Sequence, residues 1–234
     1  AACSPQPRRV LAAPLSKLDD VVLWEDTLVL EENDSVINTR PTVSRLPSGQ
    51  FLLVDHAETQ IRRYSPAGKL LTFFGKEGPG PGEFGSLGAA VWLPSGDIVA
   101  FDRGGRVARF DSVGVPKGRA VLTGLSPIYD AEPLTDSLVL VAGRRTGNPD
   151  TDLLHIWDTV TQSPVGVSFF PVPQHPREFD QAYAQSGSVD AVVHGDTIAA
   201  VFALSDTLYL FHTDGRKIRQ VPIPFRKFRR LREP

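Results

Sequence analysis

The sequence predicts an all-β chain folded as a β-propeller of four-stranded antiparallel blades. One order of signals returns along the chain: turn, apolar strand, loop, strand, turn, strand. The repeat is close to 47 residues, the spacing from Ser48 to Ser95 and again from Phe110 to Trp157. Twenty Gly and twenty Pro supply many turn signals, and 41% hydrophobic with 22% charged residues is a globular composition. A period of this length indicates blades that stack around an axis, because a single blade cannot bury both of its faces.

The first residues predict an anchor rather than a blade. Ala1-Ala2-Cys3-Ser4 resembles the end of a bacterial lipoprotein signal, in which the cysteine thiol receives a diacylglycerol. That resemblance implies lipid attachment at Cys3 and a lipid-anchored position in the bacterial cell envelope, in the periplasm or on the outer surface. A chance cysteine is the alternative. We expect residues 1–18, which are rich in proline and polar residues, to form the tether of this anchor.

The remaining residues, 19–234, are expected to form one propeller domain. Val21–Leu30 is a strand candidate that precedes the clear repeat units. A short helix is expected near Glu178–Ala184, where the spacing between units lengthens. The expected blade units lie at about residues 40–75, 88–122, 134–170 and 191–223.

The first two units carry the clearest signals. In the first, a turn at 47–49 precedes the apolar run Phe51–Val54, and Asp55 ends that strand. The second unit repeats this order and ends its strand at Asp102. Repetition at one blade position predicts that both aspartates cap turns by accepting backbone N–H bonds. In the third unit, Asp136–Val141 is expected to be the inner strand.

The chain resembles the NHL-repeat propellers, especially the six-bladed TolB-like type of bacterial lipoproteins. The residues that carry this resemblance are Asp55, Ile61, Tyr64, Gly68, Phe74, Gly75 and the run Gly78-Pro79-Gly80-Pro81-Gly82-Glu83-Phe84. The resemblance implies six blades, whereas the sequence shows four units, or five with Val21–Leu30. We therefore expect an incomplete propeller of four to five blades that is truncated at its C-terminus, with a compact smaller ring as the alternative.

Few residues indicate chemistry. The loop 75–85 is rich in glycine, but Pro79 and Pro81 remove two of the N–H donors that a phosphate site needs, so it is read as a crossing between blades. No HExxH or G-x-S-x-G motif occurs, and one cysteine excludes a Cys-rich metal site. We therefore expect no catalytic residue, no metal and no cofactor. The basic run Phe225–Arg230 is too short and too close to the end to indicate nucleic-acid recognition.

The expected function is that of an envelope-anchored binding or scaffold propeller, and a non-enzymatic one is favoured. Its ligand or envelope protein partner would bind the loops that follow the inner strands, and a monomer is expected. The alternative is a propeller lyase or lactonase-like hydrolase with a metal in the central channel. The candidate ligand-binding residues on this loop face are His56, Glu58, Arg103, Arg144 and Arg145.

Overall fold

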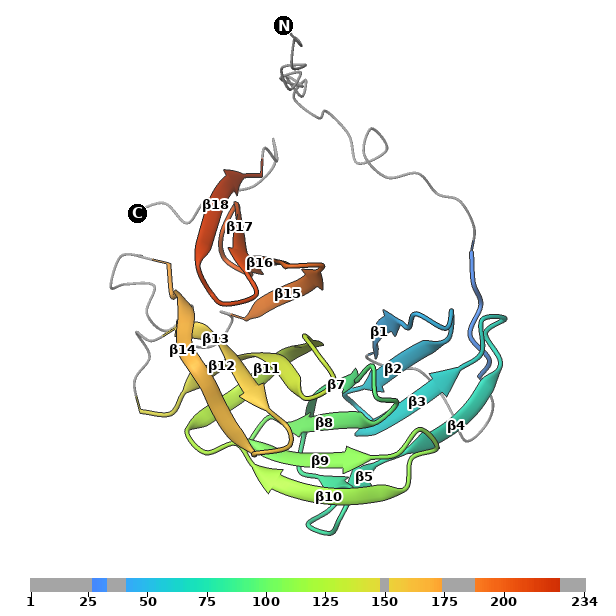
Figure 1. The fold of residues 1–234 in the computed structure, drawn as a ribbon. Helices are drawn as coiled ribbons and strands as arrows, with labels where there is room; N and C mark the ends of the chain where they lie inside the picture. Colours follow the sequence, from blue (N-terminus) through green and yellow to red (C-terminus); the bar gives the residue numbers. More distant parts are fainter. Residues whose placement is uncertain (1–26, 33–40, 148–151, 174–187, 224–234) are drawn as a thin grey trace, which may run out of the picture.

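The computed structural model describes residues 27–32, 41–147, 152–173 and 188–223. These residues form four four-stranded antiparallel sheets and one short two-stranded pair, with no helix among them. The four sheets follow one another in chain order along an arc, with the first and the fourth at its two ends (Figure 1). The all-β fold predicted from the sequence is confirmed, and the described part of the chain is a β-propeller of four blades.

Blades one and two come from the two clearest sequence units. Blade one consists of β1 (Pro41–Arg45), β2 (Phe51–Asp55), β3 (Gln60–Tyr64) and β4 (Leu70–Phe74). A short parallel pair follows in the crossing, formed by β5 (Lys76–Glu77) and β6 (Glu83–Phe84). Blade two consists of β7 (Leu87–Trp92), β8 (Ile98–Asp102), β9 (Arg106–Phe110) and β10 (Pro116–Val121).

Blades three and four have the same order of strands. Blade three consists of β11 (Leu125–Pro133), β12 (Leu138–Arg145), β13 (Asp152–Asp158) and β14 (Ser163–Pro171). Blade four consists of β15 (Val189–His194), β16 (Thr197–Phe202), β17 (Thr207–His212) and β18 (Lys217–Pro222). Blade three therefore begins at Leu125, earlier than the expected unit 134–170. The strand expected at 136–141 overlaps β12, which begins at Leu138 and is the second strand of the blade, whereas β11 is the inner strand.

Turn chemistry fixes where the strands of blade one reverse. Gly49 and Gly68 have positive φ values of 82° and 79°, which glycine adopts without steric cost. The Gly49 N–H donates to the Leu46 carbonyl, and the Gly68 N–H donates to the Ser65 carbonyl. These two turns join β1 to β2 and β3 to β4.

The hydrophobic core is divided into three clusters, one at each boundary between consecutive blades. The cluster between blades one and two includes Leu52 and Phe110, and the next includes Phe101 and Trp157. The cluster between blades three and four includes Phe211. Phe110, Trp157 and Phe211, the aromatic residues before the turns of blades two, three and four, therefore pack between blades.

Several expectations fall outside the described residues. These are the lipid attachment at Cys3, the tether, the first part of Val21–Leu30, the helix near 178–184 and the basic run near the end of the sequence. Residues 27–30 are described and form no strand; the Glu31 N–H donates to the Gly68 carbonyl of blade one. The described residues include no helix that could cross a membrane.

Candidate functional site

Asp55 lies at the end of β2 and is fully buried. One of its carboxylate oxygens accepts the Ala57 and Glu58 N–H groups at 3.0 and 3.1 Å. The other forms an ion pair with the buried guanidinium of Arg62 at 3.0 Å. The side chain therefore fixes the loop after β2 and joins it to β3.

Asp102 occupies the equivalent position at the end of β8. Its carboxylate accepts the N–H groups of Gly104 and Gly85 at 2.6 Å each, and that of Ser86 at 3.3 Å. Burial alone would raise the pKa of Asp102, but these hydrogen bonds lower it below the usual value. Arg106 donates to Asp102 and to the Gly78 carbonyl. The glycine-rich crossing is thus held against the loop after β8.

His56 joins the inner strands of blades one and two. Its Nδ1 lies 3.0 Å from the Leu87 carbonyl oxygen, and its Nε2 lies 3.3 Å from the Thr42 hydroxyl. Both ring nitrogens therefore have partners within the propeller. This arrangement gives the imidazole a role in holding two blades together.

The other candidates are not gathered at one point. Glu58 and Arg103 are exposed on neighbouring loops, and Arg144 is buried. Arg144 and Arg145 lie on opposite faces of β12, because successive side chains of a strand alternate. Arg145 alone of the five candidates lines the pocket described next.

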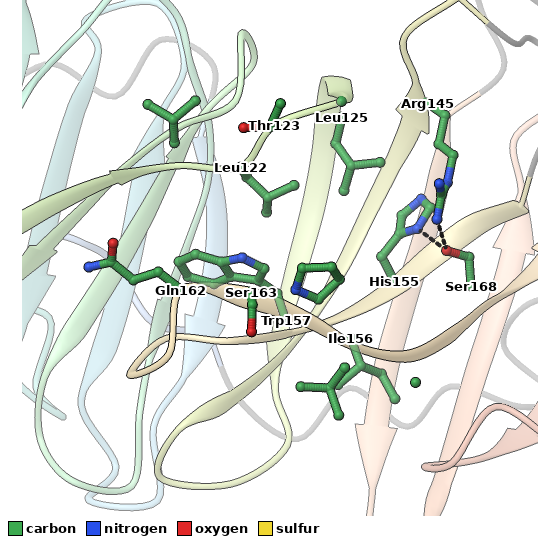
Figure 2. Close-up of a pocket in the computed structure, with 15 residues that line it drawn as sticks. Leu122, Thr123, Leu125, Arg145, His155, Ile156, Trp157, Gln162, Ser163 and Ser168 are labelled. Carbon is green, nitrogen blue, oxygen red and sulfur yellow. Dashed lines mark hydrogen bonds between the residues drawn. The ribbon is translucent and has the colours of Figure 1, made fainter.

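A pocket of about 290 Å³ lies between the outer strand of blade two and the outer strands of blade three. Its lining comes from residues 121–125, 145, 155–157, 162–166 and 168. Arg145, His155 and Ser168 lie at one end, whereas Trp157, Gln162 and Ser163 lie at the other (Figure 2). The volume is near the lower end, roughly 300 Å³, of small-molecule sites.

Three side chains form a connected network at the polar end of this pocket. The Ser168 Oγ lies 2.7 Å from His155 Nδ1, and Arg145 donates to the same Oγ at 3.0 Å. His155 Nε2 lies 3.2 Å from the Gly143 carbonyl oxygen. The pairing of β13 with β14 shifts between Leu154 and Ile156, so β14 bulges near Ser168. Bulges often redirect a side chain beside a functional site.

The protonation state of His155 determines which atoms of this network donate hydrogen bonds and which accept them. Burial lowers the pKa of His155 to about 4, so the imidazole is neutral at pH 7. A neutral imidazole has one donor and one acceptor nitrogen. Since a carbonyl can only accept, Nε2 donates to Gly143, and Nδ1 accepts the Ser168 hydroxyl proton. The Ser168 oxygen in turn accepts from Arg145, whose guanidinium is thereby held at the mouth of the pocket.

Asp152 modifies the charge at this end of the pocket. Burial raises the pKa of the Asp152 carboxyl, and the charge of Arg145 acts in the opposite direction. The Arg145 guanidinium and the Asp152 carboxyl group are therefore close enough to interact electrostatically. A bound anion would accept hydrogen bonds from the N–H groups of Arg145 that do not contact Ser168.

A larger pocket of about 470 Å³ is lined by the last residues of the inner strands β1, β7 and β11. Two arginines line it. Arg45 is exposed, whereas Arg63 donates to the Ser112 carbonyl and lies 5.5 Å from the centre of the Trp92 ring. These two contacts engage the guanidinium within blades one and two. In the smaller pocket the one arginine, Arg145, is held by Ser168 and His155, and for this reason we take that pocket as the candidate site.

Two carboxyl groups of β11 face blade four. Asp130 accepts the Ala191 N–H of β15 at 3.1 Å, and Glu132 lies on the same face of β11. Burial raises the pKa of Asp130 to about 6, and burial together with the charge of Asp130 raises the pKa of Glu132 to about 7. No group of three His, Cys, Asp or Glu side chains within the described ranges is arranged to hold a metal ion.

These raised values predict how stability depends on pH. Glu132 binds its proton more tightly in the folded protein than in the unfolded chain, so stability falls as pH rises from about 4.5 to about 7. We expect Glu132→Gln to reduce this loss and to stabilise the protein at pH 8. Urea unfolding between pH 5 and 8 measures how the free energy of unfolding depends on pH. Glu58→Gln, at an exposed position, is the control. Parallel pH profiles for the wild type and Glu132→Gln would contradict the assignment.

Comparisons with known proteins bear on the fold. No protein-family model matches the chain, and no curated protein matches its sequence. A catalytically inactive variant of virginiamycin B lyase from Staphylococcus aureus, solved with quinupristin, is similar with a TM-score of 0.52 and 15% identity. The match covers 78% of this chain and 55% of the lyase. A candidate exported protein from Bacteroides fragilis has a TM-score of 0.51 and 14% identity, with coverages of 84% and 75%.

These matches define the class of protein but not its activity. The chain spans about half the length of two of the proteins that it matches, 55% of the lyase and 48% of a computationally designed protein. At identities of 14–15%, the likeness shows the fold alone. The class is therefore that of a β-propeller protein, with four blades in the described residues.

Sequence reasoning missed most of the candidate pocket. Neither Ser168 nor His155 belongs to a recognisable motif. The signal available was the pair Arg144-Arg145 at the end of a strand, which places one arginine on each face of the blade. Which one faces a pocket depends on the adjacent blade.

Proposed function

We propose that this chain is a binding propeller whose pocket between blades two and three takes a small anionic molecule with a flat apolar part. The observation that carries the proposal is the position of Arg145. Ser168 holds the guanidinium at 3.0 Å, and the neutral His155 holds Ser168 at 2.7 Å. A cation fixed in this way loses little further freedom when it binds an anion.

The residues that line the pocket suit both the anionic group and the flat apolar part of the proposed ligand. Arginine presents several N–H donors in a planar fork, which suits a carboxylate or a phosphate. Trp157, Leu122 and Leu125 supply apolar surface away from the arginine. Binding sites commonly combine an apolar lining with a few fixed polar groups.

We further propose that the propeller is held at the bacterial envelope by a lipid on Cys3. The supporting observations are the Ala1-Ala2-Cys3-Ser4 sequence and the likeness in fold to a candidate exported protein. Mass spectrometry of the N-terminal peptide of the native protein tests this part. A diacylglyceryl group on Cys3 is the expected result, and an unmodified thiol would exclude the anchor.

Titration with simple probes tests the pocket. We expect benzoate and phenyl phosphate to bind, and the uncharged benzamide to bind at least about tenfold more weakly, because a charged hydrogen bond contributes about 1.5–3 kcal/mol. Arg145→Gln is expected to lose benzoate binding by a similar factor. Isothermal titration calorimetry measures both differences.

The matched control for Arg145→Gln is Arg103→Gln. Arg103 is also an exposed arginine on a blade loop, but it does not line the pocket. We expect Arg103→Gln to bind benzoate like the wild type. Equal affinities for benzoate and benzamide, or equal losses in the two variants, would exclude Arg145 as the anion-binding residue.

A further inference from the structure

Ser168 and His155 have the arrangement of a nucleophile and its general base. The Ser168 Oγ lies 2.7 Å from His155 Nδ1, within the range of about 2.6–3.2 Å that such a pair needs. On the other side of the ring, His155 Nε2 lies 3.2 Å from the Gly143 carbonyl oxygen. That second contact fixes the orientation of the imidazole, as the third group of a catalytic triad does.

The hydroxyl of Ser168 keeps one lone pair for a reaction. A serine hydroxyl has one donor hydrogen and two acceptor lone pairs. The hydrogen is donated to His155, and one lone pair accepts from Arg145 at 3.0 Å (Figure 2). No other hydrogen bond to this oxygen is formed among the described residues. Because Ser168 is partly exposed and lines the pocket, the second lone pair can attack a carbon atom bound there.

Arg145 lies where negative charge would develop in such a reaction. When Ser168 attacks a carbonyl carbon, the charge moves to the carbonyl oxygen on that same carbon. The guanidinium already donates to the attacking oxygen, and its other N–H groups lie in the same plane. Donors fixed close to the developing charge stabilise the transition state of acyl transfer.

We propose that Ser168 is the nucleophile of an acyl-transfer reaction in this pocket, and that the chain hydrolyses esters whose acyl part is flat and apolar. The inference rests on the proposed function, because it uses the same pocket and makes the proposed anion the product of the reaction. The acyl group would lie along the apolar lining of Leu122, Leu125 and Trp157. The carboxylate formed by hydrolysis would then lie beside Arg145.

The reaction proceeds in two stages. Ser168 Oγ attacks the ester carbon while His155 Nδ1 takes the hydroxyl proton, and the bond from that carbon to the leaving oxygen then breaks. The leaving alcohol takes the proton from His155, and the acyl group stays bonded to Ser168. Water next attacks the acyl carbon and gives one proton to His155, which returns it to Ser168 as the acid leaves. One water and one ester thus give one alcohol and one carboxylic acid.

The surroundings of His155 favour one kind of leaving group. Burial lowers the pKa of His155 to about 4, and the charge of Arg145 also lowers it. Asp152 is the carboxyl group that interacts with Arg145 in turn. A base of low pKa takes up a proton weakly but returns it readily. We therefore expect esters of phenols, whose oxygen leaves easily, to react faster than esters of aliphatic alcohols.

Hydrolysis of 4-nitrophenyl benzoate tests the inference. We expect the wild-type chain to release 4-nitrophenol with saturation kinetics, and Ser168→Ala to reduce the rate to that measured without protein. His155→Gln is expected to lose about 100-fold or more, the contribution of a general base. Ser112→Ala, at an exposed serine of blade two, is the control and is expected to keep the wild-type rate. Circular dichroism spectra show whether each variant is folded.

Two further measurements distinguish a catalytic from a structural contact between Ser168 and His155. Phenylmethanesulfonyl fluoride is expected to bond to Ser168 of the wild-type chain with loss of fluoride, which mass spectrometry of the Ser168 peptide detects. The kcat/KM is expected to stay level from about pH 5.5 to 8, because a histidine of pKa about 4 remains neutral there. A base of ordinary histidine pKa, about 6.5, would lose activity below that pH.

Benzoate titration separates failure of this inference from failure of the proposed function. Benzoate binding that depends on Arg145, without ester hydrolysis and without a modified Ser168, would overturn the nucleophile and leave the binding function standing. Hydrolysis that depends on Ser168, without benzoate binding, would exclude the anion site and support the nucleophile. A wild-type rate in Ser168→Ala, or sulfonylation of other residues alone, would also overturn the inference.

Discussion

Replacing Asp55 by alanine is expected to destabilise the protein by about 3–5 kcal/mol, because it leaves the charge of Arg62 buried without its carboxylate partner. Asp55 and Arg62 are 0% and 1% exposed, and their ion pair is 3.0 Å long. The substitution also removes the acceptor of the Ala57 and Glu58 N–H groups. Equilibrium unfolding in urea measures the free energy of unfolding of the variant and of the wild type.

Asp158→Ala is the matched control for this prediction. Asp158 accepts the Val160 and Thr161 N–H groups in an exposed turn, much as Asp55 does in its loop. It has no ion pair with a buried arginine among the described residues, so we expect a loss of about 0.5–1.5 kcal/mol. The double variant Asp55→Ala with Arg62→Met is expected to lose less than Asp55→Ala alone, since the buried guanidinium is removed as well. Similar losses for Asp55→Ala and Asp158→Ala would contradict the importance of the ion pair.

Phe101→Ala is expected to lower the free energy of unfolding by about 3–5 kcal/mol, because it opens a cavity between blades two and three. Phe101 is fully buried, and its ring lies edge-on to Trp157 with centroids 6.1 Å apart. Trp157 lines the candidate pocket, so we also expect weaker benzoate binding in this variant. Urea unfolding and calorimetric titration measure the two effects.

The control for Phe101→Ala is Val113→Ala, on an exposed turn of the same blade. Val113 is 58% exposed, and surface substitutions of this kind change stability by roughly 0.5 kcal/mol or less. We expect Val113→Ala to leave benzoate binding unchanged. A loss in Phe101→Ala no greater than that in Val113→Ala would show that the blade boundary does not depend on this aromatic contact.

The sequence was sufficient for the fold where each signal was local. Positive φ at Gly49 and Gly68 and the apolar run in β2 are properties of short segments, and they recur in blade two. The strand β11 was missed because its sequence, LSPIYDAEP, contains two prolines and two carboxylates. It becomes a strand because its partners β12 and β7 supply the packing, which no local pattern shows.

The site was less predictable because it depends on two blades. The sequence pointed to loops after the inner strands, and five of their residues were named together. The structure places His56 at the boundary of blades one and two and Arg145 at that of blades two and three. The contact of Arg145 with Ser168 depends on the bulge in β14 and spans 23 residues of sequence. Sequence spacing alone carries no signal for such a contact.

Mapping the bound ligand tests the central claim most directly. In NMR spectra of the protein, added benzoate is predicted to shift the side-chain N–H signals of Arg145 and Trp157, and the shifts should be lost in Arg145→Gln. Signals of His56 and Arg103 are predicted to stay in place. Shifts confined to His56 and Arg103, with Arg145 and Trp157 unchanged, would contradict a binding site between blades two and three.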